Sequence, residues 1–252
     1  MDAATQRRLG ISFDRAADRY AASRPAYPDA AVDWLLAGRD GDVLDLGAGS
    51  GSLTRALTLR VARVVAAEPS PHLLAELRAG SCAVPAVRAG AELLPFAVAS
   101  FDVVAVATAF HWFDAERALP EIARTMRRGG HLALIWNTRT LTVPWTHELD
   151  LLLRSAQPPT LHGAWGTDSV HWLEKSARFA RPEYAEFDHV QLLDRDSLLA
   201  LVGSRSYVIS LPPPDQEALL AKVARLFDAS ADPGGTLALP YRAQCWRAGV
   251  HP

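Results

Sequence analysis

Apolar runs and amphipathic runs alternate along the first half of the chain. Segments 42–46, 61–67 and 101–107 are continuous apolar stretches rich in β-branched residues, which is typical of buried strands. A weaker strand is expected over 83–89, where Pro85 indicates irregular pairing. Buried strands without polar alternation favour a parallel sheet that is covered on both faces.

Helices are expected between these strands, as a parallel sheet requires. The first runs from Ser52 to about Arg60, with Leu53 and Leu57 on one face. The others are predicted by their end signals. Ser70 and Pro71 begin the second, Asp114 caps the third, Pro120 lies inside it, and Gly129 and Gly130 end it before a fifth strand over 131–136.

The alternation stops after Trp136. Segment 137–182 is richer in Trp, His, Pro and Ser, and we interpret it as an insertion or cap. The predicted subdivision is a core with an N-terminal lid helix over 1–139, a substrate cap over 140–182, and the rest of the sheet over 183–252. The last part is expected to contain a strand over 184–192, an antiparallel strand over 236–246, and helices over 197–202 and 215–228.

Composition narrows the classes of function. The chain has 252 residues, 49% of them apolar, and its 26 basic and 28 acidic residues give a net charge of -2. We therefore expect no nucleic-acid partner, since proteins that bind nucleic acids usually carry a clear basic excess or stripe. Cys82 and Cys245 form neither a disulfide framework nor a zinc-ligand pattern, and no metal is expected. The chain has no apolar run long enough for a membrane span, so a cytoplasmic location is expected.

The strongest motif is Val-Leu-Asp-Leu-Gly-Ala-Gly-Ser-Gly at 43–51. A glycine turn between a strand and a helix lets the backbone approach a ligand closely. Dinucleotide enzymes have glycine at the first, third and sixth positions of this turn, but here the sixth is Ser52. Glu68 ends the next strand, where such folds place a carboxylate that binds ribose hydroxyls.

This motif resembles motif I of the class I S-adenosylmethionine-dependent methyltransferases. The resemblance implies an α/β fold, Rossmann-like, with a doubly wound, seven-stranded, mostly parallel sheet and a cap after the fifth strand. It implies S-adenosylmethionine as cofactor and places Asp45 near its ammonium group and Glu68 on its ribose. Cofactor contacts are expected from Asp45, Gly47, Ala48, Gly49, Gly51, Glu68, Pro69, Ala91, Glu92 and Thr108.

Two further segments carry the resemblance. The stretch 90–96 is similar to the family's adenine-binding loop, although Gly90 stands where the family has Asp, which leaves Ala91 and Glu92 as candidates. The run His-Trp-Phe-Asp at 111–114 and the N-terminal residues Tyr20 and Arg24 are similar to a type 11 branch that includes trans-aconitate methyltransferase. The resemblance implies that Tyr20 and Arg24 close over the cofactor and that the acceptor is a small molecule.

His111 is the candidate catalytic base, because imidazole titrates near neutral pH; packing beside the cofactor is the other interpretation. Asp114 either orients His111 or caps a helix, and we prefer the cap. Candidate acceptor contacts are Trp145, Trp165 and Trp172 or, for a carboxylate, Arg139, Arg205 and Tyr207. Three alternatives stay open: an NAD-dependent oxidoreductase, a non-catalytic binding module and a macromolecular methyltransferase. The resemblance also implies transfer to an oxygen, a carboxylate or a hydroxyl, of a small metabolite, whereas the identity of the acceptor and the oligomeric state are not predicted.

Overall fold

The structure is a computed structural model that describes residues 25–80, 83–157 and 166–251. The predictions made for Tyr20, Arg24, Cys82 and Trp165 lie outside these residues. Within the described ranges, no helix is both long and apolar enough to cross a membrane.

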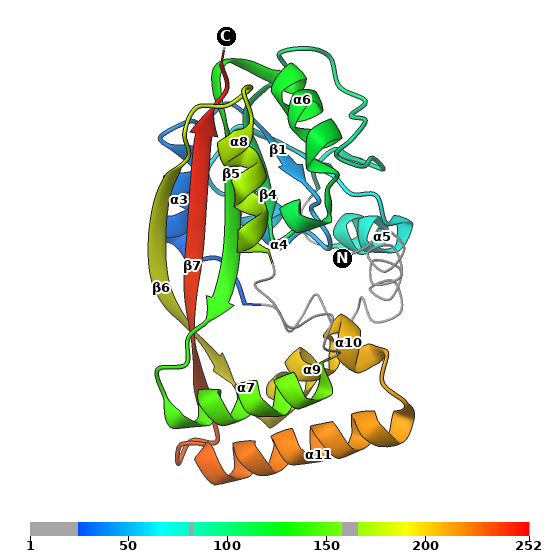
Figure 1. Ribbon diagram of the computed structural model, residues 1–252, viewed down its shortest axis with the longest axis vertical. Helices are drawn as coiled ribbons and strands as arrows, with labels where there is room; N and C mark the ends of the chain where they lie inside the picture. Colours follow the sequence, from blue (N-terminus) through cyan, green and yellow to red (C-terminus); the bar gives the residue numbers. More distant parts are fainter. Residues whose placement is uncertain (1–24, 81–82, 158–165, 252) are drawn as a thin grey trace. The chain divides into compact units, whose positions relative to one another are not determined.

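The described strands form one seven-stranded sheet in the order β3-β2-β1-β4-β5-β7-β6 (Figure 1). Strands β1 to β5 run parallel to one another. β7 runs against β5 and β6, as the arrows in Figure 1 show. The strands are β1 (Asp42–Leu46), β2 (Arg63–Ala67), β3 (Ala86–Val87), β4 (Phe101–Ala107), β5 (Met126–Arg139), β6 (Glu183–Leu193) and β7 (Leu237–Gly249).

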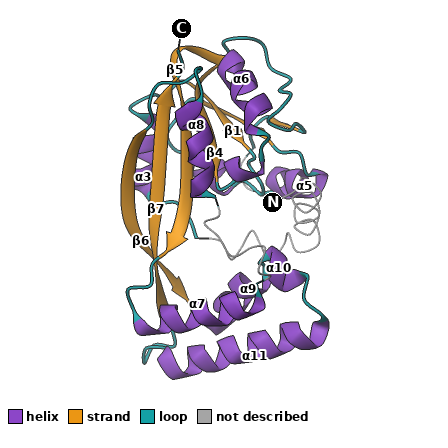
Figure 2. Ribbon diagram, in the orientation of Figure 1, coloured by secondary structure: helices purple, strands orange, loops and turns teal. Residues whose placement is uncertain are grey.

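Both faces of the parallel part are buried, as the apolar strand sequences predict. Successive side chains of β4 point to opposite faces, so Val104 and Val106 enter one core and Val103 and Ala105 the other. The first core also contains buried residues of α6 (Ala115–Thr125) and α8 (Val170–Lys175). The second contains residues of α3 (Asp29–Leu36) and α4 (Ser52–Thr58). Figure 2 shows these helices as purple ribbons beside the orange strands.

A further group of helices has a separate core. Leu149 and Leu153 of α7 (Pro144–Ala156) pack with Val223 of α11 (Pro213–Ser230) and with buried residues of α9 (Arg195–Gly203). The short helix α10 (Ser206–Ile209) belongs to the same group, whereas the turn η3 (Thr167–Ser169) directly precedes α8. The chain thus divides into two compact units, one formed by 26–137, 166–187 and 243–251 and the other by 138–157 and 188–242.

Two predictions about α6 are wrong in detail. The helix ends at Thr125, and Gly129 and Gly130 lie inside β5. A β-carbon on Gly130 would lie 2.8 Å from the backbone oxygen of Asp102, so this glycine permits the irregular pairing of β5 with β4. Asp114 occupies the N-cap position, but its side chain makes no capping hydrogen bond. The helix continues through Pro120, as expected.

Candidate functional site

Open α/β sheets bind ligands beyond the carboxyl ends of their strands, where the order of the strands reverses. β1 has β2 on one side and β4 on the other, so the reversal lies between β1 and β4. The sequence-predicted cofactor residues follow the ends of these strands. Asp45 to Gly51 lie at the end of β1, Glu68 and Pro69 at that of β2, and Thr108 at that of β4.

The turn between β1 and α4 combines one tight glycine with one open glycine. Gly47 has φ +72°, and a β-carbon on it would lie 2.7 Å from the β-carbon of Ala109. Gly49 has φ +57°, and no described atom lies within 4 Å of the place where its β-carbon would be. The turn therefore packs closely at Gly47 and leaves space beside Gly49, where a ligand can reach the backbone.

Glu68 fixes this turn from the end of β2. Its Oε2 accepts a hydrogen bond from the Gly49 N–H at 2.9 Å, and its Oε1 accepts one from the Ser70 N–H at 2.9 Å. The residue is buried. A carboxylate has about four acceptor positions, so these bonds orient the group and are compatible with further donors such as a pair of hydroxyls.

Asp45 is fully buried at the end of β1. Thr54, in the first turn of α4, donates to its Oδ2 at 2.5 Å, whereas Oδ1 is buried and has no hydrogen-bond partner among the described residues. Burial raises the pKa of Asp45 to about 7, the Thr54 hydrogen bond opposes the rise, and the charge of Glu68 adds to it. A positively charged ligand group fits this site, because it would pair with Oδ1 and favour the ionised carboxylate.

Thr108 follows β4 in a strained backbone conformation. Its φ of +53° lies in the left-handed region, which a β-branched residue seldom adopts. Its N–H donates to the Ile135 carbonyl at 2.8 Å, and its hydroxyl is hydrogen-bonded to the Tyr27 hydroxyl at 3.1 Å. Strain that is held by its surroundings in this way is typical of ligand sites.

His111 comes next, in the short helical turn η1 (Phe110–Trp112). Its Nδ1 accepts a hydrogen bond from the indole N–H of Trp136 at 3.5 Å. Trp136 is buried in β5, and a β-carbon on Gly166 would lie 2.6 Å from its indole nitrogen, so the ring is tightly packed. Because a neutral imidazole has one donor and one acceptor nitrogen, this contact favours the tautomer of neutral His111 that carries its proton on Nε2.

The loop between β3 and β4 is attached to α6 near both ends of the helix. At the start, Glu92 Oε1 accepts a hydrogen bond from the Asp114 N–H at 2.9 Å. The carboxylate of Glu92 thus lies at the N-terminus of α6, where the helix dipole favours a negative charge. Ala91, the other predicted adenine contact, is buried beside it.

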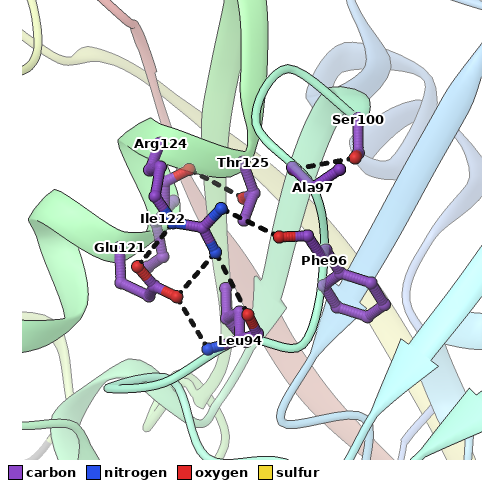
Figure 3. A network of polar contacts seen from close by, with 8 residues as sticks. All are labelled: Leu94, Phe96, Ala97, Ser100, Glu121, Ile122, Arg124 and Thr125. Carbon is purple, nitrogen blue, oxygen red and sulfur yellow. Dashed lines mark hydrogen bonds and ion pairs between the residues drawn. The ribbon is translucent and has the colours of Figure 1, made fainter.

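Near the end of α6, Glu121 and Arg124 bind the backbone of the same loop (Figure 3). Arg124 donates to the carbonyls of Phe96 at 2.8 Å and Leu94 at 3.1 Å, while Glu121 accepts from the Leu94 N–H at 2.8 Å. The two side chains also form an ion pair at 2.7 Å, and hydrogen bonding to Arg124 lowers the pKa of Glu121. These contacts fix the loop that carries Ala91 and Glu92.

Comparison with known proteins identifies the chain. Residues 44–134 match the family model of the methyltransferase domain. An uncharacterized methyltransferase of Mycobacterium tuberculosis is 39% identical over 97% of this chain and 98% of its own length. The chain belongs to the class I S-adenosylmethionine-dependent methyltransferases.

Other relatives agree with this assignment. A solved structure of a proposed type II methyltransferase from Anaeromyxobacter dehalogenans is similar with a TM-score of 0.68 and 25% identity, over 89% of this chain and 97% of the other. A malonyl-[acyl-carrier protein] O-methyltransferase of Enterobacter lignolyticus is 35% identical over 50% of this chain and 51% of its own length. The predictions of fold, enzyme class and cofactor are therefore confirmed: this methyltransferase uses S-adenosylmethionine as its methyl donor.

The residues present fit that cofactor. The unpartnered Oδ1 of buried Asp45 suits an ammonium group, oriented Glu68 suits paired hydroxyls, and the open side of Gly49 admits a ligand. Sequence reasoning missed three residues that orient this site: Thr54, Trp136 and Tyr27. Thr54 lies on the first turn of α4 and follows the glycine motif closely, which was the one signal available.

The other candidates lie elsewhere in the structure. In the unit formed by 138–157 and 188–242, Trp145 packs against the helical core, and Arg139, Arg205 and Tyr207 lie near one another. In the other unit, Trp172 of α8 is 40% exposed. Cys245 is buried, which raises the pKa of its thiol to about 12. Among the described residues, no group of three or more His, Cys, Asp or Glu side chains is arranged to hold a metal ion.

Proposed function

We propose that this methyltransferase transfers the methyl group to an oxygen of a small molecule. The observation that carries the proposal is the hydrogen bond from Trp136 to Nδ1 of His111, which leaves a proton on Nε2 of the neutral ring. A side chain in this state donates a hydrogen bond and does not remove a proton. An acceptor that is already anionic, such as a carboxylate, needs no base, and the Enterobacter relative is named as an O-methyltransferase.

His111 then has a different role from the base expected from sequence. Its Nε2–H donates a hydrogen bond to the acceptor and holds it in position. When bound, S-adenosylmethionine supplies a methyl group that its sulfonium activates for in-line attack. The protein accordingly has to align the two molecules and exclude water, and positioning of this kind accounts for much of the rate enhancement in such reactions.

The cofactor contacts remain those expected from the family resemblance, and the structure supports them unequally. Asp45 pairs with the ammonium group and Glu68 with the ribose, each through oxygens whose surroundings favour those partners. Ala91 is the better adenine contact, because an oxygen of Glu92 already accepts a hydrogen bond from α6. Tyr20 and Arg24, outside the described residues, are kept as proposed contacts.

The acceptor and its surroundings are also part of the proposal. The near balance of charge supports a small-molecule acceptor and gives no support to a nucleic-acid partner. We keep a cytoplasmic location and the assignment of 140–182 to the substrate cap as proposals.

The experiment has two stages. Calorimetric titration with S-adenosylmethionine, S-adenosylhomocysteine and NAD is expected to show binding of the first two alone. Small acids and alcohols are then incubated with methyl-labelled cofactor, and label released by mild base identifies a methyl ester. Label that resists base and lies on nitrogen or carbon would contradict the oxygen acceptor, and binding of NAD alone would contradict the cofactor.

His111→Ala tests the proposed role of the side chain. Loss of one hydrogen bond to the acceptor should lower kcat/KM by about tenfold, with no change in the shape of its pH profile. A fall in kcat/KM of about 100-fold or more, together with loss of the acidic limb of the pH profile, would show instead that His111 is the catalytic base. Trp136→Phe, which removes the indole donor and keeps an aromatic ring, should reproduce part of the loss.

A further inference from the structure

Two arginines and two tyrosines lie close together in the unit formed by 138–157 and 188–242. Arg139 ends β5, Arg205 links α9 to α10, Tyr207 belongs to α10 and Tyr241 to β7. The side chain of Arg139 is only 17% exposed. Burial and the positive charge of Arg205 lower the pKa of Arg139 to about 10, while Tyr241, Tyr207 and Asp150 oppose that shift.

The acidic partner available to Arg139 is poorly placed. Asp150 of α7 lies 3.6 Å from Arg139, beyond hydrogen-bond distance, and accepts a hydrogen bond of 2.5 Å from the exposed Arg154 instead. One carboxylate therefore faces two arginines, and Arg205 adds a further positive charge. The group has more positive charge than its described partners neutralise.

Arg205 gives the second, independent observation. Among the described residues, its buried Nε has no hydrogen-bond partner, and no acidic side chain forms an ion pair with its guanidinium group. An unpaired buried donor weakens the folded state, more so when it is charged, and two like charges in a partly buried place repel each other. Such an arrangement is favourable when an anion lies between the two groups.

We propose that Arg139 and Arg205 bind a carboxylate group of a small molecule. Guanidinium groups bind carboxylates through paired N–H donors, and the Tyr207 hydroxyl can add another hydrogen bond. This inference goes beyond the proposed function, because the site lies within one unit of the chain and does not depend on which group is methylated. The binding site itself follows from the side chains alone.

The test is a titration of the protein with small carboxylates, followed by calorimetry. Succinate, tricarballylate and citrate are compared with succinamide, which has the same shape without charge, and with inorganic phosphate. At least one carboxylate should bind, and succinamide should not. Binding of phosphate without any carboxylate would overturn the carboxylate assignment, and binding of neither anion would overturn the site.

Arg205→Gln is the decisive variant. It should weaken carboxylate binding by about tenfold or more, because a charged hydrogen-bond donor is lost. It should leave the free protein at least as stable as the wild type, because an unpartnered cation is removed. Arg195→Gln is the matched control, since Arg195 lies in the same unit and pairs with Asp228 on the surface; its carboxylate affinity should not change.

S-adenosylmethionine affinity is measured on the same samples, so the two proposals fail separately. Normal cofactor binding without carboxylate binding would refute the arginine site and leave the methyltransferase proposal intact. If Arg205→Gln is destabilised and binds carboxylate normally, the arginine has a structural role only. Tyr207→Phe, a smaller change, should weaken carboxylate binding by about fivefold in a protein of unchanged stability.

Discussion

The buried carboxylate of Asp45 predicts that cofactor affinity rises with pH. An ammonium group pairs with the ionised form of Asp45, but a pKa of about 7 leaves much of the free protein protonated near neutrality. With that pKa, the ionised fraction rises about fivefold between pH 6 and pH 7 and about twofold further by pH 8. Affinity for S-adenosylmethionine should follow this fraction until the cofactor's own amino group begins to lose its proton near pH 8.

Calorimetry measures both the affinity for S-adenosylmethionine and the number of protons released when it binds. Titrations from pH 6.0 to 7.5 in buffers of different ionisation enthalpy should show release of about 0.9 proton at pH 6 and about 0.5 at pH 7. 5′-Methylthioadenosine is the matched ligand, because it keeps the adenosine and lacks the amino acid. Its affinity should not depend on pH across this range.

Variants of Asp45 and Glu68 test whether the ionisation of Asp45 causes the pH dependence of cofactor affinity. Asp45→Asn should bind the cofactor about tenfold or more weakly at pH 7.5 and lose the pH dependence. Glu68→Gln should keep the dependence but move its midpoint to lower pH, since the charge of Glu68 contributes to the raised pKa. Wild-type affinity that stays within about twofold from pH 6 to 7.5, or an unchanged slope in Asp45→Asn, would refute the reasoning.

The ionisation of Asp45 has the opposite effect on the stability of the folded protein, which falls as the pH rises. The folded protein binds the Asp45 proton more tightly than the unfolded chain does, so this group's contribution to stability is lost as the pH rises from about 4 to about 7. Unfolding by urea across that range should show a smaller loss for Asp45→Asn than for the wild type.

Three further predictions concern the unit that contains β1 and β4. Gly49→Asn should weaken cofactor binding by about tenfold and change the free energy of unfolding by under about 1 kcal/mol, because Asn tolerates positive φ. Gly38→Asn is the control, since Gly38 has φ +72° and open space around it. Equal cofactor affinity of the two variants would refute the argument that a ligand lies beside Gly49. Arg124→Gln should speed hydrogen exchange of amides 90–100 and weaken cofactor binding, whereas the exposed Arg117→Gln on the same helix should do neither. Burial lowers the pKa of His131, so the protein should lose stability below about pH 6.5, and His131→Gln, measured by urea unfolding, should lose less.

Local patterns predicted most of the parallel sheet. The bounds expected for β1 and β4 agree with the structure, because both strands are continuous apolar runs between polar ends. The glycines at 129 and 130 misled the prediction, since the same residue type ends helices and permits irregular strand pairing. The third strand was expected over 83–89 with irregular pairing at Pro85, but it covers only Ala86–Val87.

Long-range contacts account for what the sequence did not predict about the site. The tautomer of His111 depends on Trp136, 25 residues later in the chain, and no spacing rule connects them. The sequence left two interpretations of Arg139 and Arg205 open, a contact with a carboxylate substrate and a position on the solvated surface. It could not decide between them, because the burial of these side chains depends on the packing of α7, α9 and β7. Glu92 was predicted from a motif as a cofactor contact. Its hydrogen bond from the Asp114 N–H depends on where α6 begins, which the motif does not indicate.

Two of the buried side-chain atoms that lack a hydrogen-bond partner among the described residues have opposite charge preferences. Oδ1 of Asp45 suits a cation, and Nε of Arg205 suits an anion. An unpaired buried polar atom lowers the stability of the free protein. A neutral residue of similar size at either position would fill the same space without this cost, so packing alone does not require a charged side chain there. Asp45→Asn at pH 7.5 and Arg205→Gln should therefore both preserve or raise the free energy of unfolding while weakening the binding of a charged ligand, the opposite of what a structural role predicts. If either variant instead unfolds more readily and binds as the wild type does, that residue stabilises the fold and its assignment to a ligand is wrong.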